Sequence, residues 1–169
     1  MLENASSPAQ LPWYVAHTRP RSEKKLAEYC DEQGFVHSLP LYRSVKKYRG
    51  KRVVFHKPLF PNYLFLRIQP EDRAKILQNR HVANLLTVPD QAEFEQQLGG
   101  ILTALDTDYD ICVLPEIKAG VRVRIKSGPL RGLEAWVESR EKLANVQLRL
   151  DFIGQAAVVA LEAELLELA

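Results

Sequence analysis

The segment from Lys57 to Ile68, KPLFPNYLFLRI, most limits what this chain can fold into. Pro61 lies inside it. Because proline has no backbone N–H to donate in a sheet, a regular strand should begin near Asn62. Successive side chains of a strand point to opposite faces, so one face carries Leu64, Leu66 and Ile68 and the other Tyr63, Phe65 and Arg67. The segment therefore predicts a β-strand with an aliphatic core face.

The second face of this strand has two interpretations. Tyr63 and Phe65 stand where a solvated sheet would carry polar groups. A central strand that is buried on both sides would explain them. An exposed aromatic patch that marks a partner site would explain them equally well.

Composition excludes several classes of protein. The 169 residues can bury one good core or two small ones, and 46% apolar with 26% charged residues is ordinary for a globular protein. No stretch reaches the length of a membrane span, and residues 1–10 lack the pattern of a signal peptide. Cys30 and Cys112 form no metal-like spacing, and we expect both thiols to be free. We therefore expect a cytoplasmic protein without membrane association.

Positive charge is concentrated in the first half of the chain, although the net charge is only +2. The segment from Phe35 to Arg67 contains no acid and eight cations: Arg43, Lys46, Lys47, Arg49, Lys51, Arg52, Lys57 and Arg67. Residues 45–55 within it read as a hairpin with its turn at Gly50. Such a ribbon could lie along a nucleic acid, or its lysines could simply protect a sheet edge. The asymmetry of charge indicates a polyanionic partner for the first half.

A second basic group lies at the start of a predicted helix. Ser22 suits the N-cap of a helix that runs to about Gln33 and ends at Gly34. Lys24 and Lys25 lie in its first turn, where the helix dipole disfavours positive charge. Together with Arg19 and Arg21 they form a donor-rich helix start that could bind phosphate or could be a solvated surface.

The remaining pattern predicts two domains. The first is an α+β domain over 13–105, preceded by a flexible tail, 1–12. Its further strands are expected at 13–17, 36–41 and 82–88, and its further helices at 71–79 and after Asp90. Residues 53–56 are expected to pair with the strand at 62–68. The last helix carries a core stripe: Phe94, Leu98, Ile101, Leu102 and Leu105. Residues 106–117 are acidic and aperiodic and read as a linker. Short alternating strands then predict a small β-barrel over 118–169.

No catalytic constellation is present in the sequence. The histidines, His17, His37, His56 and His81, are scattered, and no metal-binding pair, P-loop or dinucleotide fingerprint occurs. We therefore expect that the protein is not an enzyme and holds no cofactor or metal. An enzyme whose site the sequence does not reveal is kept as a third interpretation of the function.

These features together resemble the NusG family of transcription elongation factors. WYVAHT, the basic helix, the hairpin and PLFPNYLF are similar to its amino-terminal domain. KAGVRVRIKSGPLRGLEAWVE looks like a KOW motif, with Gly120, Gly128, Pro129 and Gly132 where that motif has them. LFPNYLF is most similar to the specialised RfaH-type paralogues. The resemblance runs from Trp13 to Leu168 and implies an antiparallel sheet flanked by helices, a linker and an SH3-like barrel.

The resemblance implies a monomeric bacterial factor that binds RNA polymerase and favours elongation or antitermination. The expected contacts with the polymerase clamp helices are His17, Phe60, Tyr63, Phe65 and Leu85. The expected contacts with non-template DNA are Arg19, Arg21, Lys24, Lys25 and Arg80. The turn that would contact a ribosomal small-subunit protein or the termination factor Rho contains Phe152, Ile153 and Gln155.

Two departures from the family pattern leave questions open. RfaH carries a His-Thr-Thr segment that touches the polymerase gate loop, and here Asp72, Arg73 and Ala74 take its place, so that contact is either lost or made by charge. The carboxy-terminal domain of RfaH can also switch to a helical hairpin. Residues 155–169 have high helix propensity but residues 121–137 do not, and fold switching stays a minority hypothesis.

The alternative function is that of a KOW-containing RNA-binding protein of the ribosome or of translation. Such proteins depend on a basic surface. The acids of the carboxy-terminal half offset its cations, and this balance argues against that alternative.

Overall fold

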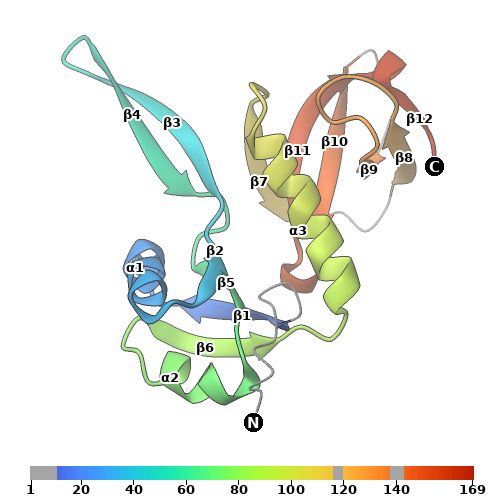
Figure 1. The fold of residues 1–169 in the computed structure, drawn as a ribbon. Coiled ribbons are helices and arrows are strands. Elements are labelled where there is room, and N and C mark those ends of the chain that lie inside the picture. Colours follow the sequence, from blue (N-terminus) through green and yellow to red (C-terminus); the bar gives the residue numbers. More distant parts are fainter. Residues whose placement is uncertain (1–10, 116–119, 138–142) are drawn as a thin grey trace. The chain divides into compact units, whose positions relative to one another are not determined.

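The computed structural model describes residues 11–115, 120–137 and 143–169, and it has an α+β fold made of two compact units (Figure 1). Unit 1 contains residues 11–41 and 45–91, and unit 2 contains residues 42–44 and the described residues from 92 onward. Among the described residues, no helix is long and apolar enough to cross a membrane. The predicted fold class is confirmed.

Unit 1 is built on a four-stranded antiparallel sheet in the order β2-β5-β1-β6. Its strands are β1 (Trp13–Thr18), β2 (Val36–Ser38), β5 (Tyr63–Arg67) and β6 (Val82–Thr87). One face is covered by α1 (Glu23–Gln33) and α2 (Arg73–Leu77), which follows the 3₁₀ turn η2 (Pro70–Asp72). Their apolar side chains pack onto the face that carries Leu64 and Leu66. The predicted aliphatic core face is therefore confirmed.

Helix α1 occupies the predicted residues, but its start is held differently. Gly34 ends the helix in the left-handed conformation, with a φ of 72°. Ser22 precedes the helix, yet its side chain makes no capping hydrogen bond, because its hydroxyl donates to the Pro20 carbonyl instead (3.4 Å). The first turn is anchored by the buried Glu23, whose carboxylate accepts the backbone N–H of Asn62 at 2.8 Å.

The predicted hairpin is present as a separate two-stranded sheet of β3 (Leu41–Tyr48) and β4 (Lys51–Pro58). Its two-residue turn has positive φ at both Arg49 (48°) and Gly50 (79°), as a type I′ turn requires. The expectation that residues 53–56 pair with β5 is wrong. Both edges of β5 are already taken, by β1 on one side and β2 on the other.

Unit 2 is an all-antiparallel sheet in the order β12-β8-β9-β10-β11-β7. The strands expected from the sequence are β8 (Val121–Ile125), β9 (Glu134–Val137), β10 (Leu143–Leu150) and β11 (Gln155–Glu162). Two 3₁₀ turns, η3 (Asp151–Ile153) and η4 (Ala163–Leu165), lead into β11 and β12 (Leu166–Leu168). The C-terminal residues are thus strands in this structure, and the helical alternative stays untested.

Residues 111–115, which the sequence assigned to an aperiodic linker, form a strand, β7 (Ile111–Pro115). This strand pairs with β11, from Ile111 opposite Val159 to Pro115 opposite Gln155. Ile111 and Val113 are half-buried and alternate with exposed neighbours, a two-residue period that the acids before them obscure. An open edge of β11 provides the backbone partners that make such a short segment a strand. Residues 116–117 lie outside the described residues, as do residues 1–10 of the predicted tail.

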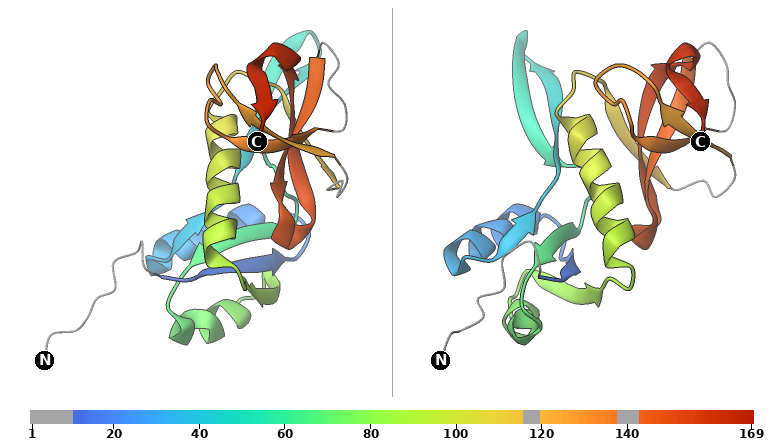
Figure 2. Two further views of the ribbon diagram at one scale, coloured as in Figure 1. Left: turned by 90° about the vertical axis from the view of Figure 1, so that its right-hand side faces the viewer. Right: turned by 45° about the vertical axis from the view of Figure 1, so that its right-hand side comes forward.

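Helix α3 (Gln91–Leu105) packs with the sheet of unit 2 and runs beside its strands (Figure 2). Phe94, Leu98 and Ile101 are buried as the periodic stripe predicted, whereas Leu102 is 37% exposed. The sequence predicted that the first domain ends at residue 105, and this boundary stays a prediction. In this structure, the residues from Ala92 onward group with unit 2.

The two cysteines should differ in reactivity. Burial raises the pKa of the Cys30 thiol to about 12, with a smaller contribution from the charge of Asp31, whereas Cys112 is exposed on β7. Only the thiolate reacts, so Ellman's reagent should modify one thiol rapidly and the second only after denaturation. A Cys112→Ser variant should lose the fast phase, and two fast phases in the native protein would contradict the buried position of Cys30.

Candidate protein and nucleic-acid interfaces

The register of unit 1 brings three polar or aromatic side chains into one row across the sheet. His17 of β1 lies opposite Tyr63 of β5 and opposite Asn84 of β6. The rings of His17 and Tyr63 stack, with centroids 5.4 Å apart and planes at 30°. His17 and Asn84 are exposed and Tyr63 is half-buried. The face opposite the core therefore presents an accessible aromatic pair.

Phe60 and Phe65 are not part of that accessible surface. They are 1% and 0% exposed and pack edge to face, with centroids 6.0 Å apart. In this structure the two rings are buried, as the alternative of a strand buried on both sides expects at Phe65. Their contact with the polymerase stays a prediction. The strand is central because β1 and β2 flank it.

Leu85 lies on the opposite face from the aromatic pair. It is 6% exposed, faces the core with Ala16 and belongs to the cluster under α1 and α2. Its neighbour Leu86 lies opposite Val15 and is half-buried, so Leu86 shares the face of Tyr63. A shift of one residue in a strand changes the face, and sequence without register could not make this choice. We call His17, Tyr63, Asn84 and Leu86 the open sheet face.

The five basic residues expected to contact DNA are all exposed: Arg19, Arg21, Lys24, Lys25 and Arg80. The structure brings three of them around His81. The backbone N–H of Arg19 donates to the His81 carbonyl at 2.9 Å. The pKa of His81 lies below its ordinary value, first because of desolvation and then because of the charges of Arg80 and Lys25.

A hollow of about 390 Å³ opens beside these cations. It is lined by Lys25, Glu28, Tyr29, Glu32, Asn79, Arg80 and His81. Sequence reasoning did not select His81, although its position next to Arg80 was a usable signal. The hollow combines an aromatic ring, an amide and an imidazole with two cations, Lys25 and Arg80, and two carboxylates, Glu28 and Glu32.

Lys24 is directed elsewhere and connects the helix start to the hairpin. Its Nζ donates to the backbone carbonyl of His56 in β4, at 2.7 Å. Arg21 precedes the helix in the left-handed conformation, with a φ of 59°, which is uncommon for a residue with a side chain. The cations of α1 and those of β4 therefore belong to adjoining surfaces.

The three positions that replace the gate-loop segment of RfaH lie at the start of α2. Asp72 forms an ion pair with Lys75, with the two charged atoms 3.7 Å apart. The guanidinium of Arg73 lies over the ring of Tyr14, 5.5 Å from its centroid. Ala74 is exposed. The role of this segment stays a prediction.

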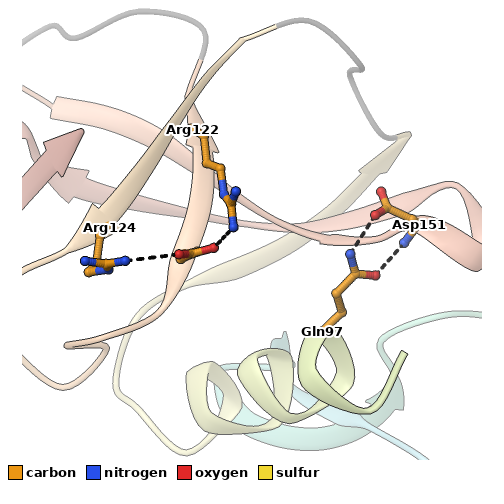
Figure 3. Close-up of polar contacts among 5 residues, drawn as sticks. Gln97, Arg122, Arg124 and Asp151 are labelled. Carbon is orange, nitrogen blue, oxygen red and sulfur yellow. Dashed lines mark hydrogen bonds and ion pairs between the residues drawn. The ribbon is translucent and has the colours of Figure 1, made fainter. Parts of the chain in front are cut away.

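The turn expected to contact a KOW partner is engaged by α3 within unit 2. Phe152 packs at right angles to Phe94, with centroids 6.3 Å apart. The Gln97 amide donates to the Asp151 carboxylate at 2.6 Å and accepts the Asp151 backbone N–H at 3.0 Å (Figure 3). Ile153 and Gln155 are half-buried. The turn is thus held in a fixed shape by a helix.

Several cations of the β-domain are matched by acids or rings. Glu134 binds both Arg122 and Arg124, the latter at 3.2 Å, and these hydrogen bonds hold its pKa below the ordinary value (Figure 3). The Arg149 guanidinium lies 3.9 Å from the centre of the Trp136 ring. A hollow of about 320 Å³ in this unit is lined by charges of both signs. Among the described residues, no group of three or more metal-binding side chains occurs.

Comparison with known proteins identifies the class of this chain. Residues 11–97 match the model of the family described as "Transcription termination factor nusG". This match covers more than half of the chain, which therefore belongs to the NusG family of transcription factors, proteins that are not enzymes.

One solved structure supports the fold, and a second is similar in sequence over most of its length. The structure "Domain interaction in Thermotoga maritima NusG" is 16% identical, covers 95% of this chain and 98% of its own, and superposes with a TM-score of 0.51. "Crystal Structure of MjSpt4:Spt5 complex conformation B" is 17% identical over 93% of this chain and 96% of its own, with a TM-score of 0.30. The first supports the same order of an α+β domain and an all-β domain.

Phe65 and Tyr63 should respond differently to truncation, although both belong to β5. Phe65→Ala removes a fully buried ring and should lower the free energy of unfolding by about 3–5 kcal/mol. Tyr63→Ala removes a ring that is partly in water and should cost clearly less. Urea unfolding of the two variants measures the difference. A loss below about 1 kcal/mol for Phe65→Ala would show that its ring is accessible in solution.

His81 should report anion binding through its pKa. A bound phosphate favours the charged imidazole, so single-stranded DNA should raise the pKa and its affinity should increase as the pH falls. Without DNA, a fall in pH has an unfavourable effect, on the stability of the protein. The pKa of His81 is lower in the folded protein than in the unfolded chain, so the unfolded chain takes up the proton first. The contribution of His81 to the free energy of unfolding therefore declines as the pH falls through about 6.5. NMR titration of the imidazole measures both. Arg80→Gln should raise the free value, and an unchanged midpoint with DNA would exclude His81 from the interface.

Proposed function

We propose that this chain is a bacterial transcription elongation and antitermination factor of the specialised RfaH type, which binds the clamp helices of RNA polymerase. The observation that carries the proposal is the stacked pair of His17 and Tyr63 on the open sheet face, within the part of the chain that matches the family. Aromatic rings bury a large area in a defined geometry. A partner helix can lay its apolar side against such a surface.

The buried residues have a supporting role in this proposal. Phe60 and Phe65 pack against each other in the unit that carries Tyr63, and Leu85 fills the core on the other face. Contact of the clamp helices with Phe60 or Phe65 would require these rings to become exposed. The first contact is therefore assigned to His17 and Tyr63, with Asn84 and Leu86 beside them.

The cations at the start of α1 are proposed to bind the non-template DNA strand. Arg19, Lys25 and Arg80 adjoin the hollow beside His81, and Arg21 and Lys24 extend the positive surface along the helix start. Phosphate contacts of this kind position a strand and weaken as the salt concentration rises. Asp72, Arg73 and Ala74 are kept as the candidate gate-loop contact.

The β-domain is proposed to recruit a second protein, either a small-subunit ribosomal protein or Rho, through Phe152, Ile153 and Gln155. Phe152 and Asp151 already bind α3. A partner must therefore add to this contact or replace it. The translation alternative is less well supported, because RNA binding needs free positive charge and Glu134 forms ion pairs with two exposed cations of this domain, Arg122 and Arg124.

Co-sedimentation tests the proposal directly. The full chain is mixed with bacterial RNA polymerase elongation complexes and, separately, with ribosomal subunits. We expect it to sediment with the polymerase, and His17→Ala with Tyr63→Ala should weaken binding about tenfold or more, as truncation of a central aromatic contact does. His37→Ala with Tyr109→Ala removes the same residue types outside the open sheet face, since His37 lies opposite Leu66 on the core face, and should bind normally.

Two outcomes would contradict the proposal. Sedimentation with ribosomal subunits alone would favour the translation function. Polymerase binding that is equally strong in both double variants would place the contact outside the open sheet face.

A further inference from the structure

The β3–β4 hairpin is a ribbon with both faces free. It forms its own two-stranded sheet and extends away from the sheet of unit 1 (Figure 1). Every residue from Val45 to His56 is exposed. A two-stranded hairpin buries too little to be stable without added support, so such complete exposure of a long ribbon calls for an explanation in terms of a partner.

Both faces of this ribbon carry positive charge. Lys46 and Lys47 are neighbours in β3, and Lys51 and Arg52 are neighbours in β4, so each pair places one cation on each face. No aspartate or glutamate occurs between Phe35 and Gln69. Lysines that only protect the edge of a sheet from aggregation would not need to be accompanied by cations on both faces, and acids could stand among them.

The cations are close enough to repel one another. Lys46 of β3 lies beside Lys57 of β4 and lowers its pKa through a hydrogen bond between the side chains and through charge repulsion. No acid of the hairpin is available to compensate these charges. A phosphate placed between them would replace the repulsion with attraction.

The exposed aromatic residues stabilise the ribbon itself. Tyr48 and Phe55 pack edge to face across the hairpin, with centroids 6.3 Å apart. Such cross-strand pairs contribute to the stability of a sheet. This edge-to-face contact makes the two rings part of the ribbon's own structure.

We propose that the β3–β4 hairpin binds double-stranded DNA by entering a groove of the duplex. The major groove is wide enough for a two-stranded ribbon, and phosphates line both of its walls. A ribbon with cations on both faces can contact both strands at once, whereas binding on a flat surface would use one face only. The Lys24–His56 hydrogen bond joins this ribbon to the cationic start of α1, so the positive surface is continuous.

Fluorescence anisotropy of the full chain on a labelled 20-base-pair duplex, and on the single strand of the same sequence, tests this assignment. The variant K47Q/K51Q/R52Q removes two lysines and one arginine from the hairpin. The control K75Q/K126Q/R131Q removes the same residue types from exposed positions elsewhere. We expect the hairpin variant to lose about tenfold or more in duplex affinity, with a salt slope smaller by about two to three, and the control to bind as the unchanged protein does.

The outcomes separate the alternatives. An equal loss in the two triple variants would show that only the net charge matters and would overturn the assignment. A loss confined to the single strand would assign the hairpin to unpaired DNA and overturn the groove proposal. Lys→Arg replacements at positions 47 and 51 keep the charge and should retain affinity. The polymerase contact of the open sheet face uses other residues, so either proposal can fail without the other.

Discussion

The antiparallel pairing of β1 with β5 is the interaction on which the interaction surfaces of unit 1 depend. It sets Ala16 opposite Leu64 under the two helices, and it sets His17 opposite Tyr63 on the other face. One register therefore builds the core and the aromatic pair together. A slip of one residue would send the apolar set into water and the rings into the core, so burial of the aliphatic face fixes the geometry of the candidate polymerase contact.

The positive surfaces are positioned by the same framework. Glu23 is buried and accepts the N–H of Asn62, which ties the start of α1 to the loop before β5. This anchor holds Lys24 against β4 and Lys25 near Arg80 and His81. A buried carboxylate at the first turn also agrees with the helix dipole, and it offsets the unfavourable position of the two lysines. Binding chemistry and helix start are therefore linked by one acid.

In unit 2, a helix and a strand that lie outside the KOW repeat complete the β-domain. β7 pairs along β11, and the side-chain amide of Gln97 binds Asp151 through its nitrogen, which donates, and its oxygen, which accepts. Phe94 supplies the ring against which Phe152 packs. The turn that carries the expected partner contacts is therefore shaped by residues far from it in the sequence. Any partner that bound this turn would have to accommodate α3.

The sequence by itself determined the α+β class, the aliphatic face of β5, the hairpin with its Gly50 turn and the helix stop at Gly34. These follow from local periods and backbone preferences, which act within a few residues. Only the tertiary structure decided that Phe65 is buried, that Leu86 rather than Leu85 shares the open sheet face, and that 111–115 is a strand. Each of these depends on which segment lies alongside another. Register and edge pairing are set by long-range burial, and a single strand carries no record of its partner.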